Sequence, residues 1–424
     1  MVSVDKYSHG LIGPDVGFFG TVRSGDRIRA VTPPGCWGPM ITPDFRGGHE
    51  VTQPVYLEGA EVGDAIAIFI EEVKVVSLAA SSGVMRLSKL AFGDDPFVDK
   101  KCPKCGTRWP KSKVVGTGQD CVHCDNCGAE VSAFHFEEGY TVAFDKETGT
   151  SLAVDEEHAH SYAIRARKYA SLPENSEQNP ILLYEPHSLT GLPVRVRASV
   201  GNIGTIPSAT IPDSHNAGDF GSSLVGAQHE YSLTKEQLDS MRTDGHLDCK
   251  DVRPGAILLC PVKVRGGGIY MGDAHSIIGT GELALHAIDV TASITVRVRL
   301  LKNINLEGPL LFPNVSDLPD IAKPFSKSER RAFASFGKRL RIRPELDLRP
   351  LQFIGSGETI NSATENAVSR ASRFLDISRA EVLNRGTVSG SVQISRLPGV
   401  VQLSLLLPYK LLEQKGIADL RMMY

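Results

Sequence analysis

Residues 245–290 read GHLDCKDVRPGAILLCPVKVRGGGIYMGDAHSIIGTGELALHAIDV, and this stretch decides the fold prediction. The apolar runs GAILLCPVKV and ELALHAIDV predict β-strands, and glycine-rich sequence separates them. Polar side chains gather at the ends of these runs. His246, Asp248 and Asp251 precede the first run, whereas Asp273, His275 and Glu282 occupy the glycine-rich segment between the two.

These side chains point to chemistry because of their types and spacing. Asp273 and His275 are two residues apart, so both face the same side of an extended segment. An imidazole flanked by carboxylates can hold a divalent cation or activate a water. The alternative is a polar loop whose aspartates cap turns.

Strand patterns continue outward from this stretch on both sides. Residues 24–33, 54–76, 191–207 and 292–302 alternate or run apolar, and the GAEVGD turn predicts a hairpin-like reversal. Residues 389–397 and 400–412 predict a closing strand pair around a Pro-Gly turn. Helical spacing covers residues 156–172, 359–376 and the segment after Ser378, with Ser362 or Thr364 capping the second of these and Ser378 the third. Residues 213–242 read as a long loop with a short helix at 234–241.

Five of the eight cysteines lie within 26 residues, in CPKCGTRWPKSKVVGTGQDCVHCDNCGAE. Cys102 and Cys105 form one CxxC pair, and Cys124 and Cys127 form another. Four thiolates satisfy the tetrahedral preference of zinc and leave no open position, so the spacing predicts a structural zinc ribbon. Cys121 is an alternative to Cys127 as the fourth ligand. His123 is a further candidate ligand, although we expect it to be an exposed residue of the knuckle.

Composition limits the classes of function. The chain has 424 residues, 46 Lys and Arg against 49 Asp and Glu, and a formal net charge of −3. This charge balance does not favour binding to nucleic acid. The basic residues around the first CxxC are interpreted as a solvated face. No apolar run is long enough to span a membrane, and the N-terminus lacks the pattern of a signal peptide. We therefore expect a cytoplasmic protein.

Several segments resemble the acetamidase/formamidase family. GIYMGDAHSIIGTGE (268–282) is similar to the family's GDxHxxQGDGE signature, and GHLDCKDVRPGAILLCPV (245–262) resembles the segment that precedes it. HEVTQPVYLEGAEVGDAIAIFI (49–70), VGNIGTIPS (200–208) and residues 365–412 resemble its early strands, its GxIGvaP stretch and its C-terminal helices and strands. The resemblance runs in register over most of the chain, apart from the ribbon and residues 213–242.

The resemblance implies a mainly β fold with some α, a sandwich or barrel scaffold into which the zinc ribbon is inserted. Residues 1–94 would form the N-terminal β part of the catalytic domain, 95–133 the ribbon, 134–330 the catalytic core, and 331–424 the C-terminal helices and closing strands. The implied reaction is hydrolysis of a small amide such as formamide, acetamide or a lactam, by a protein that is a homo-oligomer.

Matching the motifs residue by residue assigns expected roles. Glu282, His275, Asp251 and Glu58 are expected to be catalytic, with Glu282 as the general base. Asp248, Asp273 and His275 are expected to bind a second divalent metal, zinc above others. The expected substrate-binding residues are His246, Thr280 and His49. A metal-free alternative runs the same hydrolysis by carboxylate and histidine acid–base chemistry.

Some positions depart from the family pattern. Ile278 replaces the family's Gln, Thr280 its Asp, His246 its Asn, and Ser391 an acidic residue. Exchanged pocket groups change specificity within one fold, so the substrate within the amide class stays open. A binding or scaffold protein that acts through the ribbon is the alternative function.

Overall fold

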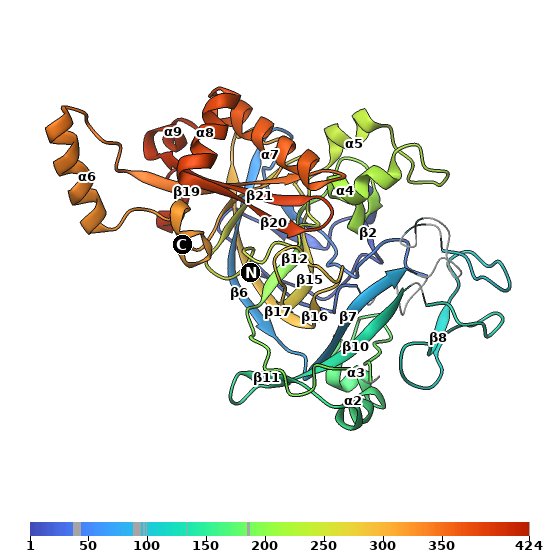
Figure 1. The fold of residues 1–424 in the computed structure, drawn as a ribbon. Coiled ribbons are helices and arrows are strands. Elements are labelled where there is room, and N and C mark those ends of the chain that lie inside the picture. The colour runs from blue at the N-terminus through green and yellow to red at the C-terminus, as the bar shows by residue number, and fades with distance from the viewer. Residues whose placement is uncertain are drawn as a thin grey trace.

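The computed structural model of the chain describes residues 1–36, 44–87, 95, 98, 100–132, 134–184 and 187–423. Strands dominate the regular structure, and helices lie at both ends of the strand body (Figure 1). The predicted mainly β fold with some α is therefore confirmed. The predicted domain limits at residues 94 and 133 lie outside the described residues.

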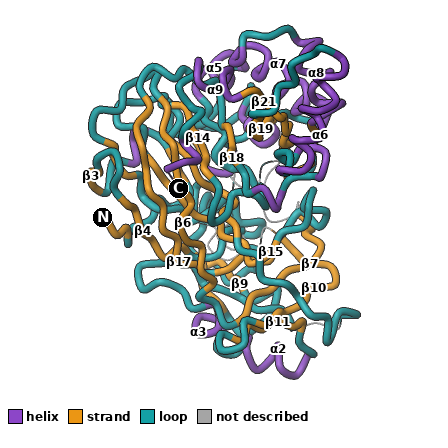
Figure 2. The backbone as a smooth tube through the Cα atoms, turned by 90° about the vertical axis from the view of Figure 1, so that its left-hand side faces the viewer, coloured by secondary structure: helices purple, strands orange, loops and turns teal. Residues whose placement is uncertain are grey.

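A nine-stranded sheet runs through the centre of the molecule, and Figure 2 shows several of its strands side by side. Its central strand β6 is buried on both faces, because alternate residues enter different cores: Ile66 and Ile68 on one side, Ala67 and Phe69 on the other. The first six residues of β6, AIAIFI, are therefore all apolar and buried, whereas residues 71–75 include charged side chains. In spatial order the strands are β1 (Val2–Val4), β4 (Arg27–Thr32), β17 (Ala292–Leu301), β6 (Ala65–Val75), β14 (Ile257–Pro261), β18 (Leu310–Phe312), β19 (Leu348–Ser356), β21 (Val400–Pro408) and β20 (Gly390–Arg396).

A second sheet packs on one face of the first. It has the order β12-β15-β5-β3, and β16 pairs with β15. Ile203 and Met271 of this sheet share a core with Ile294 and Val298 of the large sheet. The two sheets thus form a sandwich, and the strands of the second are β3 (Gly20–Val22), β5 (Val55–Leu57), β12 (Ser199–Thr205), β15 (Ile269–Ile277) and β16 (Ile288–Val290).

The predicted hairpin at GAEVGD is wrong. Strand β5 pairs with β3 and β15, whereas β6 pairs with β14 and β17, so the turn carries the chain from one sheet to the other. The two flanking strands belong to opposite layers of the sandwich. The predicted closing pair is confirmed, since β20 and β21 are antiparallel neighbours.

The cysteine-rich segment leaves the body between two paired strands. Strand β7 (Ala79–Leu87) pairs antiparallel with β10 (Phe134–Asp145), and Leu87 lies opposite Phe134. The described residues between these two strands therefore belong to a segment inserted at one place in this ladder. They include the short pair β8 (Ser112–Val114) and β9 (Val122–Cys124). Strand β11 (Thr150–Ala153) pairs with the other side of β10, and β2 (Leu11–Ile12) with β13 (Ile211–Pro212).

The helices differ from the predictions in detail. The expected helix at 156–172 is two helices, α2 (Glu156–Ala163) and α3 (Ala166–Ala170), because the chain leaves helical geometry at Arg165. Thr359, not Ser362 or Thr364, caps α7 (Ile360–Leu375), whereas Ser378 caps α8 (Arg379–Ser389) as predicted. The loop 213–242 holds α4 (Gly218–Gly221) and the predicted short helix, α5 (Lys235–Met241). The last α-helix in the described residues is α9 (Tyr409–Gln414), and a short 3-10 helix (Leu420–Met423) follows it.

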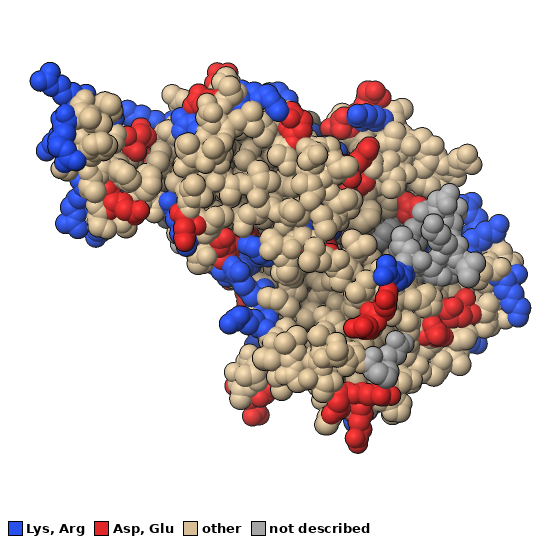
Figure 3. All heavy atoms as spheres, viewed as in Figure 1, with Lys and Arg blue, Asp and Glu red and all other residues tan. Residues whose placement is uncertain are grey.

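Helix α6 (Lys327–Leu340) projects from the body, and its basic side chains account for the Lys and Arg gathered at that end in Figure 3. Elsewhere on this face, side chains of both signs are interspersed. Within the described part of the chain, no helix has the length and apolar character needed to cross a membrane.

Candidate functional site

Buried carboxylates and imidazoles converge around strand β15. Asp273 and His275 lie on β15 itself, and Asp289 lies on the neighbouring β16. Asp248 comes from the segment before β14, and His49 from the segment before β5. Each of these side chains is almost completely shielded from solvent. The site is therefore assembled from one sheet and the connections that enter it.

The predicted proximity of Asp273 and His275 is seen in the distances. The Nε2 atom of His275 lies 3.3 Å from Oδ1 of Asp273 and 3.8 Å from Oδ1 of Asp248. His246 Nε2 is 3.0 Å from the other oxygen of Asp248. One nitrogen from each of the two histidines thus faces carboxylate oxygens from separate parts of the chain.

Hydrogen bonds fix which nitrogen of each histidine faces the cluster. His246 Nδ1 lies 2.8 Å from the carbonyl oxygen of Ser214, so Nδ1 carries the proton and donates it. His49 Nδ1 is 2.8 Å from Oδ2 of Asp213. In both residues, Nε2 is then the nitrogen that faces the centre. Metal-ligating histidines usually donate their second ring N–H to a carbonyl or a carboxylate in this way.

Asp213 is itself held rigidly. Its Oδ1 accepts backbone N–H groups from Gly48 at 3.0 Å and His49 at 2.8 Å, and its Oδ2 accepts the amide of Asn202 at 2.6 Å. These bonds stabilise the carboxylate in the protein interior and orient the His49 ring. The long loop 213–242 therefore contributes a side chain directly to the site.

Two glycines bring the backbone against the cluster. A Cβ atom on Gly201 would lie 2.5 Å from Oδ1 of Asp248 and 2.6 Å from Oδ2 of Asp273. A Cβ on Gly35 would lie 1.6 Å from Oδ1 of Asp273. No side chain fits at either position, so glycine is required by close approach.

Three of the carboxylate residues have left-handed backbone conformations. The φ angles are 46° at Asp248, 52° at Asp273 and 45° at Glu282. This region is uncommon for residues other than glycine, although aspartate enters it more readily than most. Such conformations typically carry strain of about 1–3 kcal/mol each and concentrate at functional sites. Their coincidence here marks the cluster as built for more than packing.

Arg396 closes one side of the cluster. Its guanidinium contacts Oδ2 of Asp219 at 2.6 Å and Oδ2 of Asp248 at 2.7 Å, and it stacks over the ring of Phe220. Burial alone would raise the pKa of Asp248, but His246 and Arg396 outweigh it and hold that pKa well below its ordinary value. Asp248 is therefore an anion in the folded protein.

The donor set fits a divalent cation. Oδ1 of Asp248, Oδ1 of Asp273 and Oδ1 of Asp289 are buried, and none accepts a hydrogen bond from a described residue. Burial works against a charged His275, yet Asp273, Asp289 and Asp248 raise its pKa well above the ordinary value. Negative charge is thus in excess, and buried carboxylates need a proton or a cation to compensate them. His246, Asp248 and Asp273 have donor atoms close enough to share one ion.

Glu282 is buried at the edge of the cluster. Burial raises its pKa well above the ordinary value, and Asp248 adds to this effect, whereas His275 and Arg396 oppose it. Among the described residues, no hydrogen-bond donor holds its carboxyl group. The backbone around it is fixed, because Gly281 donates to the carbonyl oxygen of Ser395 at 3.1 Å.

Three predicted residues lie apart from the cluster. Glu58 is on the surface, where it pairs with Arg23 at 2.8 Å, because it sits in the turn between the two sheets. Asp251 is buried but faces Lys250 and the amide of Gln402. The side chain of Thr280 is exposed on the turn before Glu282. The other predicted residues of the site, His49 and His246 included, are brought together.

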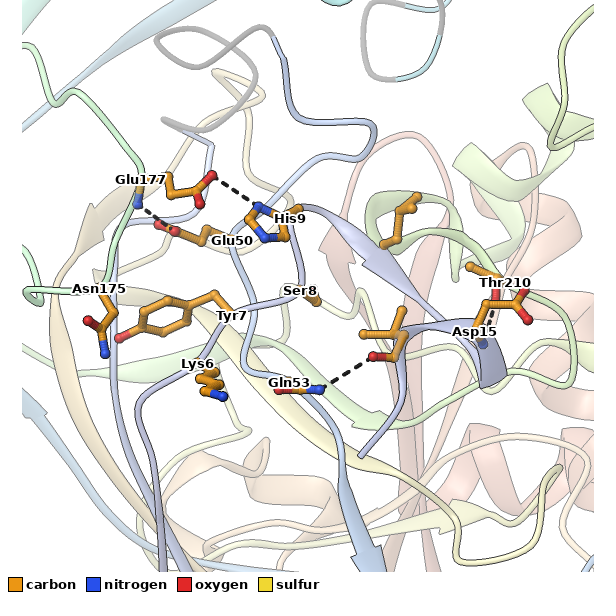
Figure 4. Close-up of a pocket in the computed structure, with 12 residues that line it drawn as sticks. Lys6, Tyr7, Ser8, His9, Asp15, Glu50, Gln53, Asn175, Glu177 and Thr210 are labelled. Carbon is orange, nitrogen blue, oxygen red and sulfur yellow. Dashed lines mark hydrogen bonds and ion pairs between the residues drawn. The ribbon is translucent and has the colours of Figure 1, made fainter. Parts of the chain in front are cut away.

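A pocket of about 520 Å³ lies beside residues 50–53, directly after His49 in the sequence, and Figure 4 shows Glu50 and Gln53 among the side chains that line it. The adjacent residue Glu50 lines this pocket and accepts the N–H of Glu177 at 2.8 Å. No described residue of the cluster lines it. Neighbouring residues of this segment thus serve different places: His49 belongs to the buried cluster and Glu50 lines the pocket. The pocket is therefore separate from the cluster.

The four predicted ribbon cysteines also meet. The Sγ atoms of Cys102 and Cys127 are 3.6 Å apart, those of Cys105 and Cys124 are 3.9 Å apart, and the four could hold one metal ion. Cys121 is outside this set. His123 turns away, since its Nδ1 lies 2.9 Å from the carbonyl oxygen of Gly128.

One basic residue of this segment differs from its expected place on a solvated face. Lys100 is fully buried and donates to the carbonyl oxygen of Phe45 at 2.8 Å. Burial lowers its pKa to about 7. The base of the ribbon therefore packs into the body, near the segment that delivers His49.

Sequence reasoning missed several members of the cluster. Asp213, Asp219 and Arg396 are far from the motif in sequence, and Cys36 is an isolated cysteine. His286 and Asp289 could have been found, because they follow the motif closely in the sequence. In the structure, Nε2 of His286 lies 3.1 Å from Oδ2 of Asp289. The run ELALHAIDV predicts one continuous strand, whereas only Ile288–Val290 forms a strand, so the predicted strand gave no sign that His286 and Asp289 would face one another.

Comparisons with known proteins agree with this architecture. The family model described as Acetamidase/Formamidase family matches residues 12–414. The Schizosaccharomyces pombe protein named "Putative formamidase C869.04" is 30% identical over 97 residues, which span 22% of this chain and 22% of that protein.

Solved structures share the fold at low sequence identity. A predicted acetamidase/formamidase from Thermoanaerobacter tengcongensis has a TM-score of 0.54 at 16% identity, covering 98% of this chain and 97% of that one. An acetamidase from Bacillus halodurans has a TM-score of 0.54 at 17% identity, with 98% and 99% covered. Both alignments cover nearly the whole of this chain.

Proposed function

This chain belongs to the acetamidase/formamidase family, and from that membership we propose that it is an amidohydrolase that cleaves the C–N bond of a small linear or cyclic amide. The observation that supports the proposal most strongly is the buried convergence of Asp248, Asp273, His275 and Glu282. Formamide, acetamide and lactams are the substrate class. Peptides lie outside it.

Amide hydrolysis requires three tasks of the site. A water must be activated, the carbonyl oxygen must be stabilised as it gains charge, and the leaving nitrogen must be protonated. The cluster offers carboxylates for proton transfer, and protonated or cationic groups for the oxyanion. Its burial excludes bulk water, which strengthens each electrostatic interaction.

We propose that Asp248, Asp273 and His275 hold a divalent cation, zinc above others, with His246 and His49 as further donors. Such a cation supplies Lewis acidity, which polarises an amide carbonyl and makes water acidic enough to attack near neutral pH. The unsatisfied carboxylate oxygens and the orientation of the two histidine rings support this assignment.

Glu282 is proposed as the group that moves the proton. Its carboxylate accepts a proton from the attacking water and returns it to the leaving nitrogen. The lack of a described hydrogen-bond donor leaves this carboxyl group free to exchange protons. Arg396 keeps Asp248 ionised on the opposite side, so the two carboxyl groups have different roles.

The ribbon is proposed to hold a structural zinc through Cys102, Cys105, Cys124 and Cys127. Four thiolates leave no position for a substrate. The predicted homo-oligomer and cytoplasmic location stay predictions.

The experiment is ammonia release from formamide and acetamide, and ring opening of a γ-lactam, by purified protein. Glu282→Gln should lower kcat by roughly 10²–10⁴-fold if the residue moves the proton. Glu61→Gln on the surface is the matched control and should leave kcat unchanged. An active Glu282→Gln protein would remove Glu282 from this role, and no turnover of any amide by the wild-type protein would contradict the function.

A further inference from the structure

A second set of donor atoms lies beside the first. Cys36 follows β4, His286 lies in the connection between β15 and β16, and Asp289 is on β16. Their ligand atoms all lie within 4.8 Å of one another. His286 Nε2 is 3.1 Å from Oδ2 of Asp289, and the backbone N–H of Cys36 donates to the same oxygen at 3.2 Å.

The side chains of His286 and Asp289 are completely buried, with 0% of each exposed. Oδ1 of Asp289 and Nε2 of His286 find no hydrogen-bond partner among the described residues. The other nitrogen of His286 lies 3.2 Å from the hydroxyl of Ser82, which fixes the ring. The contacts that these two atoms do make, with each other's side chain and with His275, lack hydrogen-bond geometry, and such buried atoms are costly unless a further group binds them.

The second set is continuous with the first. His275 Nε2 lies 3.4 Å from Oδ1 of Asp289, and the same nitrogen faces Asp273. The thiol of Cys36 belongs to both sides, because its Sγ also lies within 4.8 Å of donor atoms of His49 and Asp273. The donors therefore form one centre with two adjacent groups.

The chemistry of the second set selects the ligand. A thiolate, an imidazole and a carboxylate are the three side-chain donor types that zinc accepts in proteins. Calcium and magnesium prefer oxygen donors alone. A soft sulfur donor beside a nitrogen donor thus favours zinc.

A catalytic thiol is the competing interpretation of Cys36. Its Sγ is 3.8 Å from His49 Nε2, and His49 Nδ1 is 2.8 Å from Asp213, which gives the order of a nucleophile, a base and an orienting acid. However, the carboxylates of Asp273 and Asp289 flank this sulfur. They repel a free thiolate, whereas a cation between them would stabilise it.

We propose that Cys36, His286 and Asp289 form a second zinc position, so that the catalytic centre is dinuclear. The inference rests on the proposed function for the neighbouring position, held by Asp248 and Asp273. Paired divalent positions recur in hydrolases such as aminopeptidases. The ribbon metal is separate from both.

The test is the zinc content per chain of the purified full-length holoprotein, measured by elemental mass spectrometry. The expected content is three equivalents for the wild type, and two for Cys36→Ala and for His286→Asn. Cys260→Ala, a buried cysteine on β14 outside the cluster, is the matched control and should keep three. Two variants at different ligands preserve the test if one of them fails to fold.

Cobalt substitution gives a readout that does not depend on activity. Five thiolates would contact metal in the wild type, four in the ribbon and one at Cys36. Cys36→Ala should therefore lower the sulfur-to-cobalt charge-transfer absorbance by about one fifth, from the thiolate character of these ligands. Cys260→Ala should leave it unchanged.

The possible results separate the two proposals. Two equivalents in the wild type, unchanged in Cys36→Ala but reduced to one in Asp248→Asn, would overturn the second position and leave the first. One equivalent in the wild type would overturn both. An inactive Cys36→Ala protein that keeps the wild-type zinc content and cobalt spectrum would establish the thiol as a nucleophile instead.

Discussion

Gly201→Ala tests the geometry of the proposed centre with a single methyl group. The added Cβ would lie 2.5 Å from Oδ1 of Asp248, 2.5 Å from Cε1 of His275 and 2.6 Å from Oδ2 of Asp273. Ordinary contact begins at 3.4 Å, so the nearest atoms must withdraw by about 0.9 Å. A displacement near 1 Å in a catalytic group costs roughly 10²-fold in rate.

We therefore expect kcat/KM for formamide or acetamide to fall by roughly 10²-fold, which corresponds to about 2.7 kcal/mol of transition-state stabilisation. Gly204→Ala, on the same strand β12, is the matched control. A Cβ there would meet Cα of Gly245 at 3.4 Å and Sγ of Cys260 at 3.7 Å, which are ordinary contacts. Its kcat/KM should stay within about twofold, because no group of the cluster has to move.

The assay is steady-state ammonia release, with circular dichroism and thermal melting to confirm that both variants fold. A folded Gly201→Ala protein with wild-type kcat/KM would refute the reasoning, because the carboxylates would then tolerate displacement. Equal losses in both variants would also refute it, since they would indicate a general effect on strand β12.

The remaining predictions concern the ribbon, the surface and the buried ion pairs. Cys127→Ser should lose one zinc per chain by elemental analysis, whereas Cys121→Ser should keep it, since only Cys127 lies with the other three thiols; the reverse result would exchange their roles. Glu58→Gln should leave kcat/KM within about twofold in the ammonia assay, because this carboxylate is at the surface, away from the reacting groups. Asp219→Asn should lower the free energy of unfolding by about 3 kcal/mol in urea titrations, because it leaves Arg396 buried with one partner fewer. Unchanged stability would show that Asp248 alone compensates the buried charge of Arg396.

The sequence indicates those parts of the site that are close along the chain. Asp273 and His275 are two residues apart on one strand, and their side chains meet at 3.3 Å. The spacing of the two CxxC pairs likewise selects the cysteines that meet. In both cases local geometry, either strand alternation or the knuckle turn, determines the contact.

Contacts between distant segments could not be predicted in this way. His49 and Asp213 are 164 residues apart, and they meet only because β5 and the loop 213–242 border the same sheet. The isolated Cys36 gave no spacing to interpret. Glu58 matched a family segment, but the turn that carries it links the two sheets and faces solvent.

A feature of the sequence argues against the predicted hairpin at GAEVGD. The run AIAIFI in β6 is apolar on both faces, which is typical of a central strand between two layers. A strand of that kind needs neighbours on both sides, and β14 and β17 supply them. The sequence of the short β5 does not require β6 as a neighbour, and β5 pairs with β3 and β15 instead.

The most direct test of the central claim is ammonia release from formamide and acetamide by Asp273→Asn, at the centre of the cluster. The substitution keeps the side-chain volume and removes one negative charge. We predict a folded protein whose kcat/KM is lower by at least about 10²-fold. A folded Asp273→Asn protein with wild-type activity would contradict the assignment of amide hydrolysis to this site.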